Sequence, residues 1–310
     1  MNKISFVTPL FNEQDSLAML YQQLKSALVN SSLKSYNSEI IFINDGSTDN
    51  SLEMLKKIHE KNKSVKIISF RKNLGKSTAL NEGFKKSEGD IIVTLDSDLQ
   101  DGPENIPNLV NKLEEGYDLV VGWKQKRQDP WHKVLASKIF NFFVRISTGV
   151  PLHDFNCGLK VMTKEVTENI YLYGELHRFI PVLAAQKGFK VTEIPVVHHP
   201  RRLGVSKYGW GRLLKGCFDF LTVMFLGKFG ERPLHFFGML GGIGIFFGLI
   251  FGSYLSYLHF QGISIGRRPL LTLSELLILA GLQVLSIGLI AEMIVRKTNS
   301  ADKLPIDYEI

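Results

Sequence analysis

Short apolar runs separated by helical patterns dominate the first two hundred residues of the chain. Runs rich in Val, Ile and Phe are typical of buried strands, and the segments between them have helical periodicity. Strands of this kind joined by helices indicate an α/β fold with a mostly parallel sheet covered on both faces. The predicted strands are residues 4–8, 39–44, 65–70, 91–95, 119–121 and a later 190–197. The helical patterns begin near Gln14, Asp49, Lys76 and Glu104.

Two long apolar segments follow. Residues 234–266 contain no Asp, Glu, Lys or Arg, and a second apolar run covers residues 270–295. Each has about 25 residues or more, enough for a helix to cross a hydrocarbon core roughly 30 Å thick. We expect a soluble domain followed by a membrane hairpin. The expected parts are a domain (1–205), a juxtamembrane helix (206–232), two transmembrane helices (233–260 and 270–295) and a tail (296–310).

The hairpin carries its own packing and topology signals. Gly244, Gly248 and Gly252 share one helix face, which allows close contact either with the second span or with another copy of the chain. Glu275 and Glu292 lie near opposite ends of the second span and are expected to reach the interface. Basic residues favour both termini in the cytosol, with Lys228, Arg232, Arg296 and Lys297 on one side and Arg267 and Arg268 on the other.

Composition narrows the class of partner. The chain has 310 residues and a formal charge of +7, which suits an anionic membrane or a nucleic acid. The basic residues form no single block and no nucleic-acid motif occurs, so the membrane is expected and nucleic acid is not. Cys157 and Cys217 have no metal-binding spacing, which argues against a zinc site or disulfide framework. The N-terminus passes directly into a strand pattern without a secretory segment, so we expect the amino-terminal domain in the cytosol.

Polar clusters follow four of the predicted strands. They begin at Thr8, Asn44, Arg71 and Asp96. Any one could be an ordinary turn, and Ser47 or Thr48 could cap the next helix. Four on the carboxyl edge of one sheet indicate a ligand site instead. No GxGxxG follows the first strand and no GxxxxGK[ST] occurs, which argues against dinucleotide and P-loop sites.

Asp96 and Asp98 are the clearest candidates for chemistry. They stand one residue apart directly after a buried strand. Carboxylate oxygens are hard donors that suit Mg²⁺ or Mn²⁺, and such a metal can hold a diphosphate. The sequence therefore predicts a metal site at the end of this strand.

The chain resembles glycosyltransferase family 2, with its GT-A nucleotide-sugar fold, in four motifs. These are Thr8-Pro-Leu-Phe-Asn-Glu13, Asn44-Asp-Gly-Ser-Thr-Asp49, Asn73-Leu-Gly-Lys76 and Leu95-Asp-Ser-Asp-Leu-Gln-Asp101. More narrowly it is similar to the polyprenyl-phosphate glycosyltransferases, such as dolichyl-phosphate mannose synthases and bacterial undecaprenyl-phosphate enzymes. This resemblance includes Arg201-Arg-Leu-Gly-Val-Ser-Lys-Tyr208 and the hairpin. It implies a bacterial-type inner-membrane enzyme that transfers one sugar from a UDP- or GDP-linked donor, with inversion and with Mg²⁺ or Mn²⁺.

The resemblance also implies roles for individual residues. It implies nucleotide binding for Pro9, Phe11, Glu13, Asp45 and Lys76, and metal and diphosphate binding for Asp96, Asp98 and Gln100. Arg202, Ser206 and Lys207 match a basic loop that closes over the phosphates, with Arg202 counted among the catalytic residues. Processive synthases of the family carry a Gln-x-x-Arg-Trp motif, which is missing here, so a single transfer is expected.

Residues 131–147 read as an amphipathic helix beside the membrane. One stripe carries Trp131, Leu135, Ile139, Phe142 and Ile146, and Lys133, Ser137 and Lys138 lie nearer another. Such a helix either lies in the membrane surface or packs onto the core of the domain. The resemblance assigns the acceptor phosphate to Lys124, Lys133 and Ser137, with Lys124 replacing a common Arg. A solvated basic face is the alternative.

A lipid phosphate would explain why no general base is evident. A phosphate monoester already carries negative charge at neutral pH. Asp154 resembles a family position near the sugar and is a candidate helper, and His177 and Arg178 are candidate sugar or diphosphate contacts. The alternatives are transfer to a lipid-linked saccharide or other hydroxyl, which would make Asp154 indispensable, and a non-catalytic nucleotide-sugar-binding membrane protein.

Overall fold

The computed structural model describes residues 3–29, 31–125, 131–200, 211–230, 232–266 and 268–298. It divides into two compact units, Met1–Val223 and Met224–Ile310. The strands are β1 (Lys3–Leu10), β2 (Asn37–Asn44), β3 (Val65–Ser69), β4 (Ile91–Thr94), β5 (Leu119–Trp123), β6 (Lys160–Thr163) and β7 (Val191–Pro195). The helices of the first unit are α1 (Gln14–Val29), α2 (Ser51–Lys61), α3 (Lys76–Lys86), α4 (Ile106–Glu114), α5 (Trp131–Thr148), α6 (Lys164–Asn169) and α7 (Ile180–Gln186).

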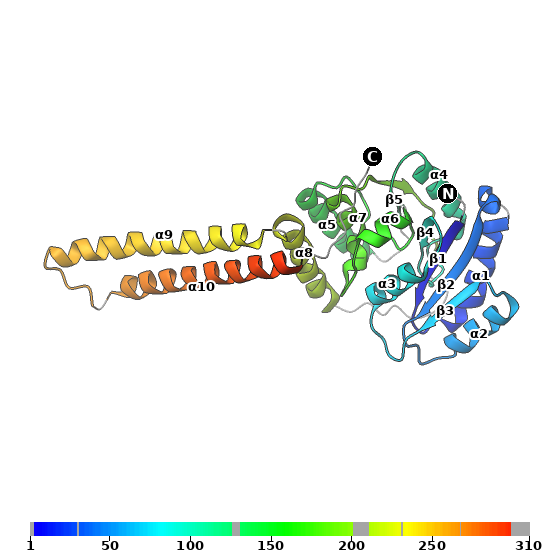
Figure 1. Ribbon diagram of the computed structural model, residues 1–310, viewed down its shortest axis with the longest axis horizontal. Helices are drawn as coiled ribbons and strands as arrows, with labels where there is room; N and C mark the ends of the chain where they lie inside the picture. Colours follow the sequence, from blue (N-terminus) through cyan, green and yellow to red (C-terminus); the bar gives the residue numbers. More distant parts are fainter. Residues whose placement is uncertain are drawn as a thin grey trace. The chain divides into compact units, whose positions relative to one another are not determined.

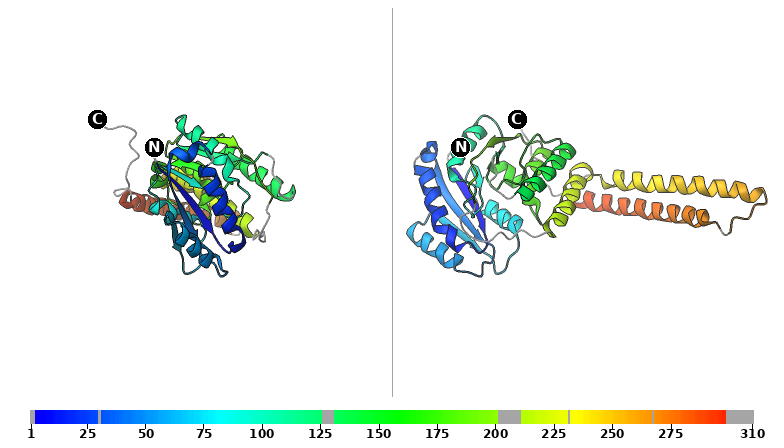
Figure 2. Two further views of the ribbon diagram at one scale, coloured as in Figure 1. Left: turned by 90° about the vertical axis from the view of Figure 1, so that its right-hand side faces the viewer. Right: turned by 180° about the vertical axis from the view of Figure 1, so that it is seen from behind.

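A seven-stranded mixed sheet forms the first unit, in the order β3-β2-β1-β4-β6-β5-β7. The pairs among β3, β2, β1 and β4 are parallel, as is β5 with β7. β6 lies antiparallel between β4 and β5. Helices α1 and α2 cover one face and α3 the other (Figures 1 and 2). The predicted α/β fold is confirmed and all six predicted strands are present, but β6 was not predicted.

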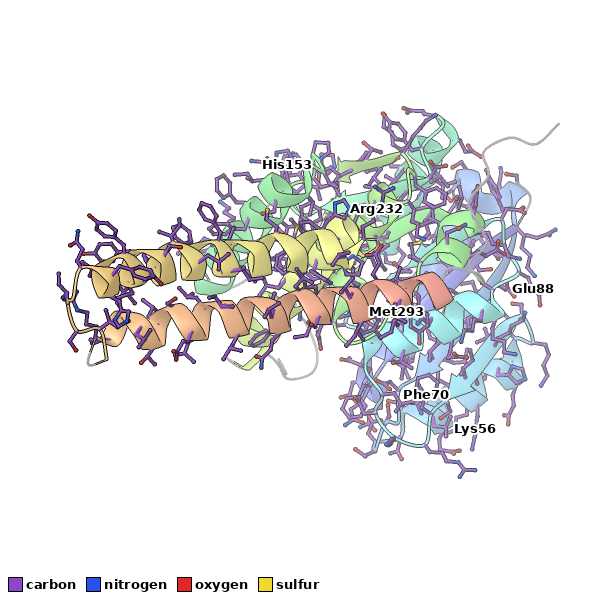
Figure 3. The ribbon with its side chains drawn as sticks, turned by 60° about the vertical axis from the view of Figure 1, so that its left-hand side comes forward. Lys56, Phe70, Glu88, His153, Arg232 and Met293 are labelled. Carbon is purple, nitrogen blue, oxygen red and sulfur yellow. The ribbon has the colours of Figure 1, made fainter. Side chains whose placement is uncertain are left out.

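A buried polar network ties together the edge of the sheet opposite the carboxyl ends of the parallel strands. The carboxylate of Glu39 accepts a hydrogen bond from Ser5 Oγ at 2.6 Å and lies 2.7 Å from Lys66 Nζ. Lys66 and Lys3 also pair with Glu88, which is labelled in Figure 3. Burial raises the pKa of Glu39, but Lys66 and Ser5 outweigh this and the pKa is lowered. Glu39 is therefore ionised in the fold and stabilises this edge.

The apolar stripe of α5 faces away from the core. Leu135, Ile139, Phe142 and Ile146 are between 49% and 64% exposed, while Val144 on the other side of the helix is fully buried. For these four side chains the core-facing alternative is wrong. The helix α8 (Gly211–Phe229) also exposes apolar side chains, among them Phe218, Leu221 and Leu226.

Two long apolar helices make up most of the second unit. α9 (Pro233–Phe260) and the Pro269–Val295 part of α10 (Pro269–Thr298) are each long and apolar enough to cross a membrane. Their outward side chains are largely apolar, as at Met293 (Figure 3). They run side by side, joined by a short connector (Figure 1).

Glycines let the two helices of the second unit approach closely. A Cβ built on Gly241 would lie 2.6 Å from Gly281 O, and one on Gly248 would lie 3.0 Å from Ser274 O. Ser274 Oγ also donates to Gly248 O at 2.7 Å. The glycine face of α9 therefore packs against α10. Of the two alternatives that the sequence left open, contact with the second span is confirmed.

Glu292 has a role beyond reaching the interface. Its Oε2 accepts a hydrogen bond from Leu234 N at 3.2 Å, at the first turn of α9. The first N–H groups of a helix have no partner within the helix, so this carboxylate caps α9 from the neighbouring helix. The prediction for Glu292 was therefore incomplete.

Candidate active site

The chain turns sharply where β4 leaves the sheet, and Asp96 and Asp98 lie in that turn. Leu95 N still bonds to Val7 O at 3.5 Å, and Asp96 is the first residue beyond this pairing. Leu99 adopts a positive φ of 61°, which is uncommon for a branched side chain. Asp98 Oδ1 accepts the backbone N–H of Gln100 at 3.2 Å. The three predicted metal ligands thus share one short turn.

Lysines surround the carboxylate of Asp96. Lys76 Nζ at the start of α3 donates to Asp96 Oδ1. Burial raises the pKa of Asp96, but the charge of Lys76 and the nearby Lys124 and Lys160 outweigh it, so the pKa is lowered. Asp96 is held ionised.

Asp98 lies in the opposite electrostatic setting. Burial, followed by repulsion from Asp96 and Asp101, raises the pKa of Asp98 to about 6. A cation near Asp98 would relieve this repulsion. Among the described residues no group of three or more His, Cys, Asp or Glu side chains is placed to hold a metal ion by itself. A site with two carboxylates fits Mg²⁺ or Mn²⁺ whose remaining ligands come from phosphate and water.

Two buried contacts of charged residues near this turn were not predicted from the sequence. Asp101 is 1% exposed and pairs with Lys124 at 2.5 Å, so Lys124 is held beside the turn that carries Asp96 and Asp98. Burial lowers the pKa of Lys124, but Asp101 outweighs this and the pKa is raised. Lys160, on the unpredicted β6, is buried, and Nζ donates to Cys157 O. Burial lowers its pKa.

The segment from His153 to Gly158 closes over the end of β4. Thr94 Oγ1 donates to Gly158 O at 3.0 Å. A Cβ on Gly158 would lie 2.6 Å from both Cγ and Oδ2 of Asp96, so only glycine leaves room for this carboxylate. The segment thus fixes the position of Asp96.

Asp154 belongs to the same segment. It is 2% exposed, and its Oδ1 accepts Asn156 N at 3.1 Å. Glu193 of β7 holds the beginning of the segment, with Oε2 accepting His153 N at 2.7 Å and Asp154 N at 3.3 Å. His153 also stacks on Trp123, with ring centroids 4.3 Å apart. Asp154 is therefore held by its neighbours on both sides.

The loops after β1 and β2 are joined by side chains. Asn12 adopts φ 54°, its N–H donates to Ser47 Oγ at 2.9 Å, and its Oδ1 accepts Thr48 N at 2.8 Å. The prediction that Ser47 or Thr48 caps the next helix is wrong. α2 begins at Ser51 after the cap residue Asn50, whose side chain makes no capping bond, and Ser51 N donates to Asp49 Oδ1 at 2.9 Å.

Asp45, a predicted nucleotide contact, orders the third loop. Its oxygens accept Leu74 N at 2.7 Å and Gly75 N at 3.0 Å. Burial, partly offset by these bonds, raises the pKa of Asp45. Gly46 has φ 68°, and a Cβ there would lie 2.6 Å from Asn73 N, so the loop packs directly on glycine.

The described residues leave a small pocket at this edge of the sheet. Its lining includes Pro9, Lys76, Asp96, Asn156, Gly158, Lys160 and His177. His177 Nδ1 lies 3.1 Å from Ser77 Oγ on α3. Pro9, Lys76 and Asp96 are thus brought together. Two other predicted nucleotide residues, Phe11 and Glu13, follow β1, and Glu13 Oε2 accepts Ser16 Oγ at 3.0 Å.

The predicted acceptor residues are only partly described. Ser137 lies on α5, and its buried hydroxyl has no hydrogen-bond partner among the described residues. Lys133 also lies on α5, but its side chain is outside the description, and Arg202, Ser206 and Lys207 fall in residues 201–210, which are outside it as well. His199 Nε2, outside the predicted acceptor residues, lies 2.6 Å from Glu104 Oε1.

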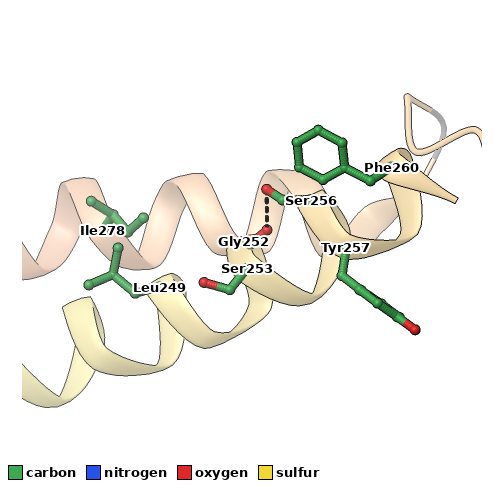
Figure 4. A pocket seen from close by; sticks show the side chains of 7 residues that line it. All are labelled: Leu249, Gly252, Ser253, Ser256, Tyr257, Phe260 and Ile278. Carbon is green, nitrogen blue, oxygen red and sulfur yellow. Dashed lines mark hydrogen bonds between the residues drawn. The ribbon is translucent and has the colours of Figure 1, made fainter.

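The second unit, described by itself, contains a larger groove. It has a volume of about 540 Å³ and is lined by Leu249, Gly252, Ser253, Ser256, Tyr257, Phe260 and Ile278 (Figure 4). Ser256 Oγ donates to Gly252 O at 2.9 Å within α9. The lining contains no carboxylate or cation, so this groove is not a candidate for the chemistry.

The sequence of the chain matches those of known proteins. The sequence profile described as glycosyl transferase family 2 matches residues 5–171. Dodecaprenyl-phosphate galacturonate synthase of Rhizobium johnstonii is 36% identical over 313 residues, covering 98% of this chain and 90% of that protein.

Solved structures resemble the first unit at lower identity. Glucosyl-3-phosphoglycerate synthase of Mycobacterium tuberculosis in complex with Mn²⁺, UDP and phosphoglyceric acid is 20% identical, with a TM-score of 0.55 over 73% of this chain and 78% of that chain. The same protein with Mn²⁺ and UDP-glucose has a TM-score of 0.54 at 20% identity, over 73% and 79% of the two chains. At this identity the likeness concerns the fold alone.

Proposed function

The chain belongs to glycosyltransferase family 2, and on that basis we propose that it transfers one sugar from a UDP- or GDP-linked donor to a polyprenyl phosphate. It is a glycosyltransferase with a GT-A fold. The acceptor is proposed from the relative, whose printed name describes a dodecaprenyl-phosphate sugar synthase and whose match extends over nearly the whole chain. The product is a polyprenyl-phosphate sugar, formed with inversion.

One observation carries the donor half of the proposal. Asp96 and Asp98 lie together at the end of β4, where Asp98 is repelled by Asp96 and Asp101. These residues and Gln100 would hold Mg²⁺ or Mn²⁺, which would stabilise the charge of the departing diphosphate. Pro9, Phe11, Glu13, Asp45 and Lys76 are proposed to bind the nucleotide. Asp45 does so indirectly, because its oxygens hold the backbone of Leu74 and Gly75.

The acceptor half rests on α5 and the turn beside it. The buried hydroxyl of Ser137 lacks a partner among the described residues, and buried hydroxyls are normally hydrogen-bonded. A lipid phosphate would satisfy it. Lys124 supplies a fixed positive charge close to Asp101, with Lys133, Arg202, Ser206 and Lys207 proposed as further phosphate contacts. Because the phosphate is already charged at neutral pH, the protein mainly aligns it with the sugar.

The exposed apolar surfaces support a membrane setting. Residues 233–260 and 270–295 are proposed to cross the bacterial inner membrane as a hairpin, with the catalytic domain and both termini in the cytosol. The exposed stripe of α5, including Leu135, Phe142 and Ile146, is proposed to lie in the membrane surface. This places the acceptor residues where a lipid phosphate is found.

The direct test is product formation in a defined membrane. The full chain, reconstituted with undecaprenyl phosphate and Mn²⁺, is given a panel of UDP- and GDP-sugars headed by a nucleotide-linked galacturonate. Mass spectrometry should find a glycosyl phospholipid with one sugar. Absence of product with every donor, from folded protein that binds nucleotide, would contradict the proposed acceptor.

Asp154→Asn separates the acceptor classes. Transfer to a phosphate should retain most of its rate, because no base is needed, whereas transfer to a lipid-linked saccharide would be lost. The same panel with a lipid-linked saccharide as acceptor provides the matched comparison. A loss of phosphate transfer above about 10³-fold, with normal nucleotide binding, would contradict this expectation and would show that Asp154 takes part in transfer to the phosphate.

A further inference from the structure

Three lysines lie around Asp96, and they differ in how firmly they are held. Lys160 is 3% exposed, and its ammonium donates to the carbonyl of Cys157. The side chain of Lys124 is 12% exposed and pairs with the buried Asp101. These two cations are built into the wall of the site and cannot leave without exposing buried partners.

Lys76 is more exposed than these two lysines. Its side chain is 30% exposed, and its ammonium contacts Asp96, whose side chain is 33% exposed. It is the first residue of α3, directly after Gly75 at φ 94°, so its stem begins at a helix end rather than inside packed structure. A partly exposed ion pair costs little to separate compared with a buried one.

The ammonium of Lys76 contacts an oxygen that the proposed metal would need. Asp96 Oδ1 accepts its hydrogen bond, and a divalent cation on the same oxygen would meet a positive charge at contact distance. The ammonium and the metal would repel each other strongly at that distance. The pair therefore competes with metal binding as long as Lys76 stays there.

We propose that Lys76 stands in for the divalent cation on Asp96 while the donor site is empty, and that the diphosphate of the donor draws it away. The inference rests on the metal site of the proposed function. It makes the binding of metal and nucleotide mutually dependent beyond the direct contact between them. Free metal alone binds weakly, since it has to displace Lys76, whereas the diphosphate gives the displaced ammonium a new partner.

The test is a titration of the full chain in detergent with Mn²⁺ alone, followed by electron paramagnetic resonance. Lys76→Met should bind Mn²⁺ about tenfold more tightly than the wild type, because the competing cation is gone. Lys72→Met is the matched control. It removes the same charge from an exposed position in the loop that precedes α3, and Mn²⁺ affinity should stay within about twofold of wild type. Equal or weaker Mn²⁺ binding by Lys76→Met would overturn the proposal.

A second titration measures the coupling between metal and nucleotide. Saturating UDP, or GDP in a parallel series, should raise the Mn²⁺ affinity of the wild type more than that of Lys76→Met, and UDP binding should be weaker in Lys76→Met. Equal coupling in the two proteins would also refute the role of Lys76. If the wild type, Lys76→Met and Lys72→Met all fail to bind Mn²⁺ in the presence of either nucleotide, the metal site of the proposed function itself is wrong. The two failures are therefore distinguishable.

Discussion

Replacing Gly158 by alanine should displace the carboxylate of Asp96 without unfolding the domain. The added Cβ would lie 2.6 Å from Cγ and Oδ2 of Asp96, whereas ordinary contact begins at 3.4 Å. The carboxylate must therefore retreat by about 0.8 Å, the difference between these two distances. The clash falls on the end of a side chain and Gly158 does not adopt a positive φ, so the backbone can stay in place.

The expected loss is in the rate of transfer and in metal affinity. A misplacement of about 1 Å can cost on the order of 10²-fold in rate, or about 2.7 kcal/mol. The melting temperature should change by only a few degrees, because alanine also restricts the unfolded chain and offsets part of the strain. The assays are kcat/KM with undecaprenyl phosphate, Mn²⁺ titration and a thermal melt, all on the same preparation.

Gly242→Ala is the control for the substitution itself. No atom lies within 4 Å of a Cβ at Gly242, so neither activity nor metal binding should change. Gly158→Ala with wild-type transfer and Mn²⁺ binding would refute the argument that this glycine positions Asp96. Loss of activity accompanied by a collapse of the melting transition would show that the backbone, rather than the carboxylate, had moved.

Three further substitutions test other parts of the structure. Asp98→Asn should abolish turnover, by more than about 10²-fold, with a melting temperature near wild type, and a collapsed fold would mean that the carboxylate is structural. Glu39→Gln should lower the free energy of unfolding by about 1–2 kcal/mol at pH 7, since Lys66 loses a buried partner. The pKa of Glu39 is lower in the folded state than in the unfolded state, so Glu39 stabilises the fold above its unfolded pKa of about 4.3, and this stabilisation is lost as the pH falls through its folded pKa. Glu39→Gln should therefore show less loss of stability over this acid range than the wild type. An unchanged dependence of stability on pH would contradict this. Gly281→Leu should lower the free energy of unfolding of the hairpin by about 2 kcal/mol, while Gly242→Leu should not. Equal melting temperatures of the two variants would exclude close packing of α9 and α10 at Gly281.

The fold was largely predictable because the central part of the sheet contains unbroken apolar runs, at residues 40–43, 91–93 and 119–121. β6 was missed because it has only four residues, Lys160–Thr163, with a polar residue at each end. Its place in the sheet depends on pairing with β4 and β5, which no local pattern reveals. The stripe on α5 was visible in the sequence, but only the structure shows that its apolar side faces outward, because periodicity is the same for either face.

The candidate site was predicted where chemistry is local and missed where it depends on distant partners. Asp96 and Asp98 follow a strand directly, so their position could be read from the sequence. Lys160 could not be found that way, since its partner, the Cys157 carbonyl, is a backbone atom. Lys124 was predicted to contact a phosphate. Its pairing with Asp101 could not be predicted, because the two residues are 23 positions apart (124 − 101) and lie in different loops.

The antiparallel placement of β6 has a consequence for how the protein is made. The hydrogen bond from Thr94 to Gly158 joins residues 64 positions apart, and β4 gains its second neighbour only when β6 arrives. Contacts with such long sequence separation form late, because the intervening chain must first be ordered. During synthesis the strands β1 to β4 can assemble early, while Asp96 acquires its final surroundings only after residue 163 has emerged. We expect the nascent domain to reach a compact state before it can bind metal.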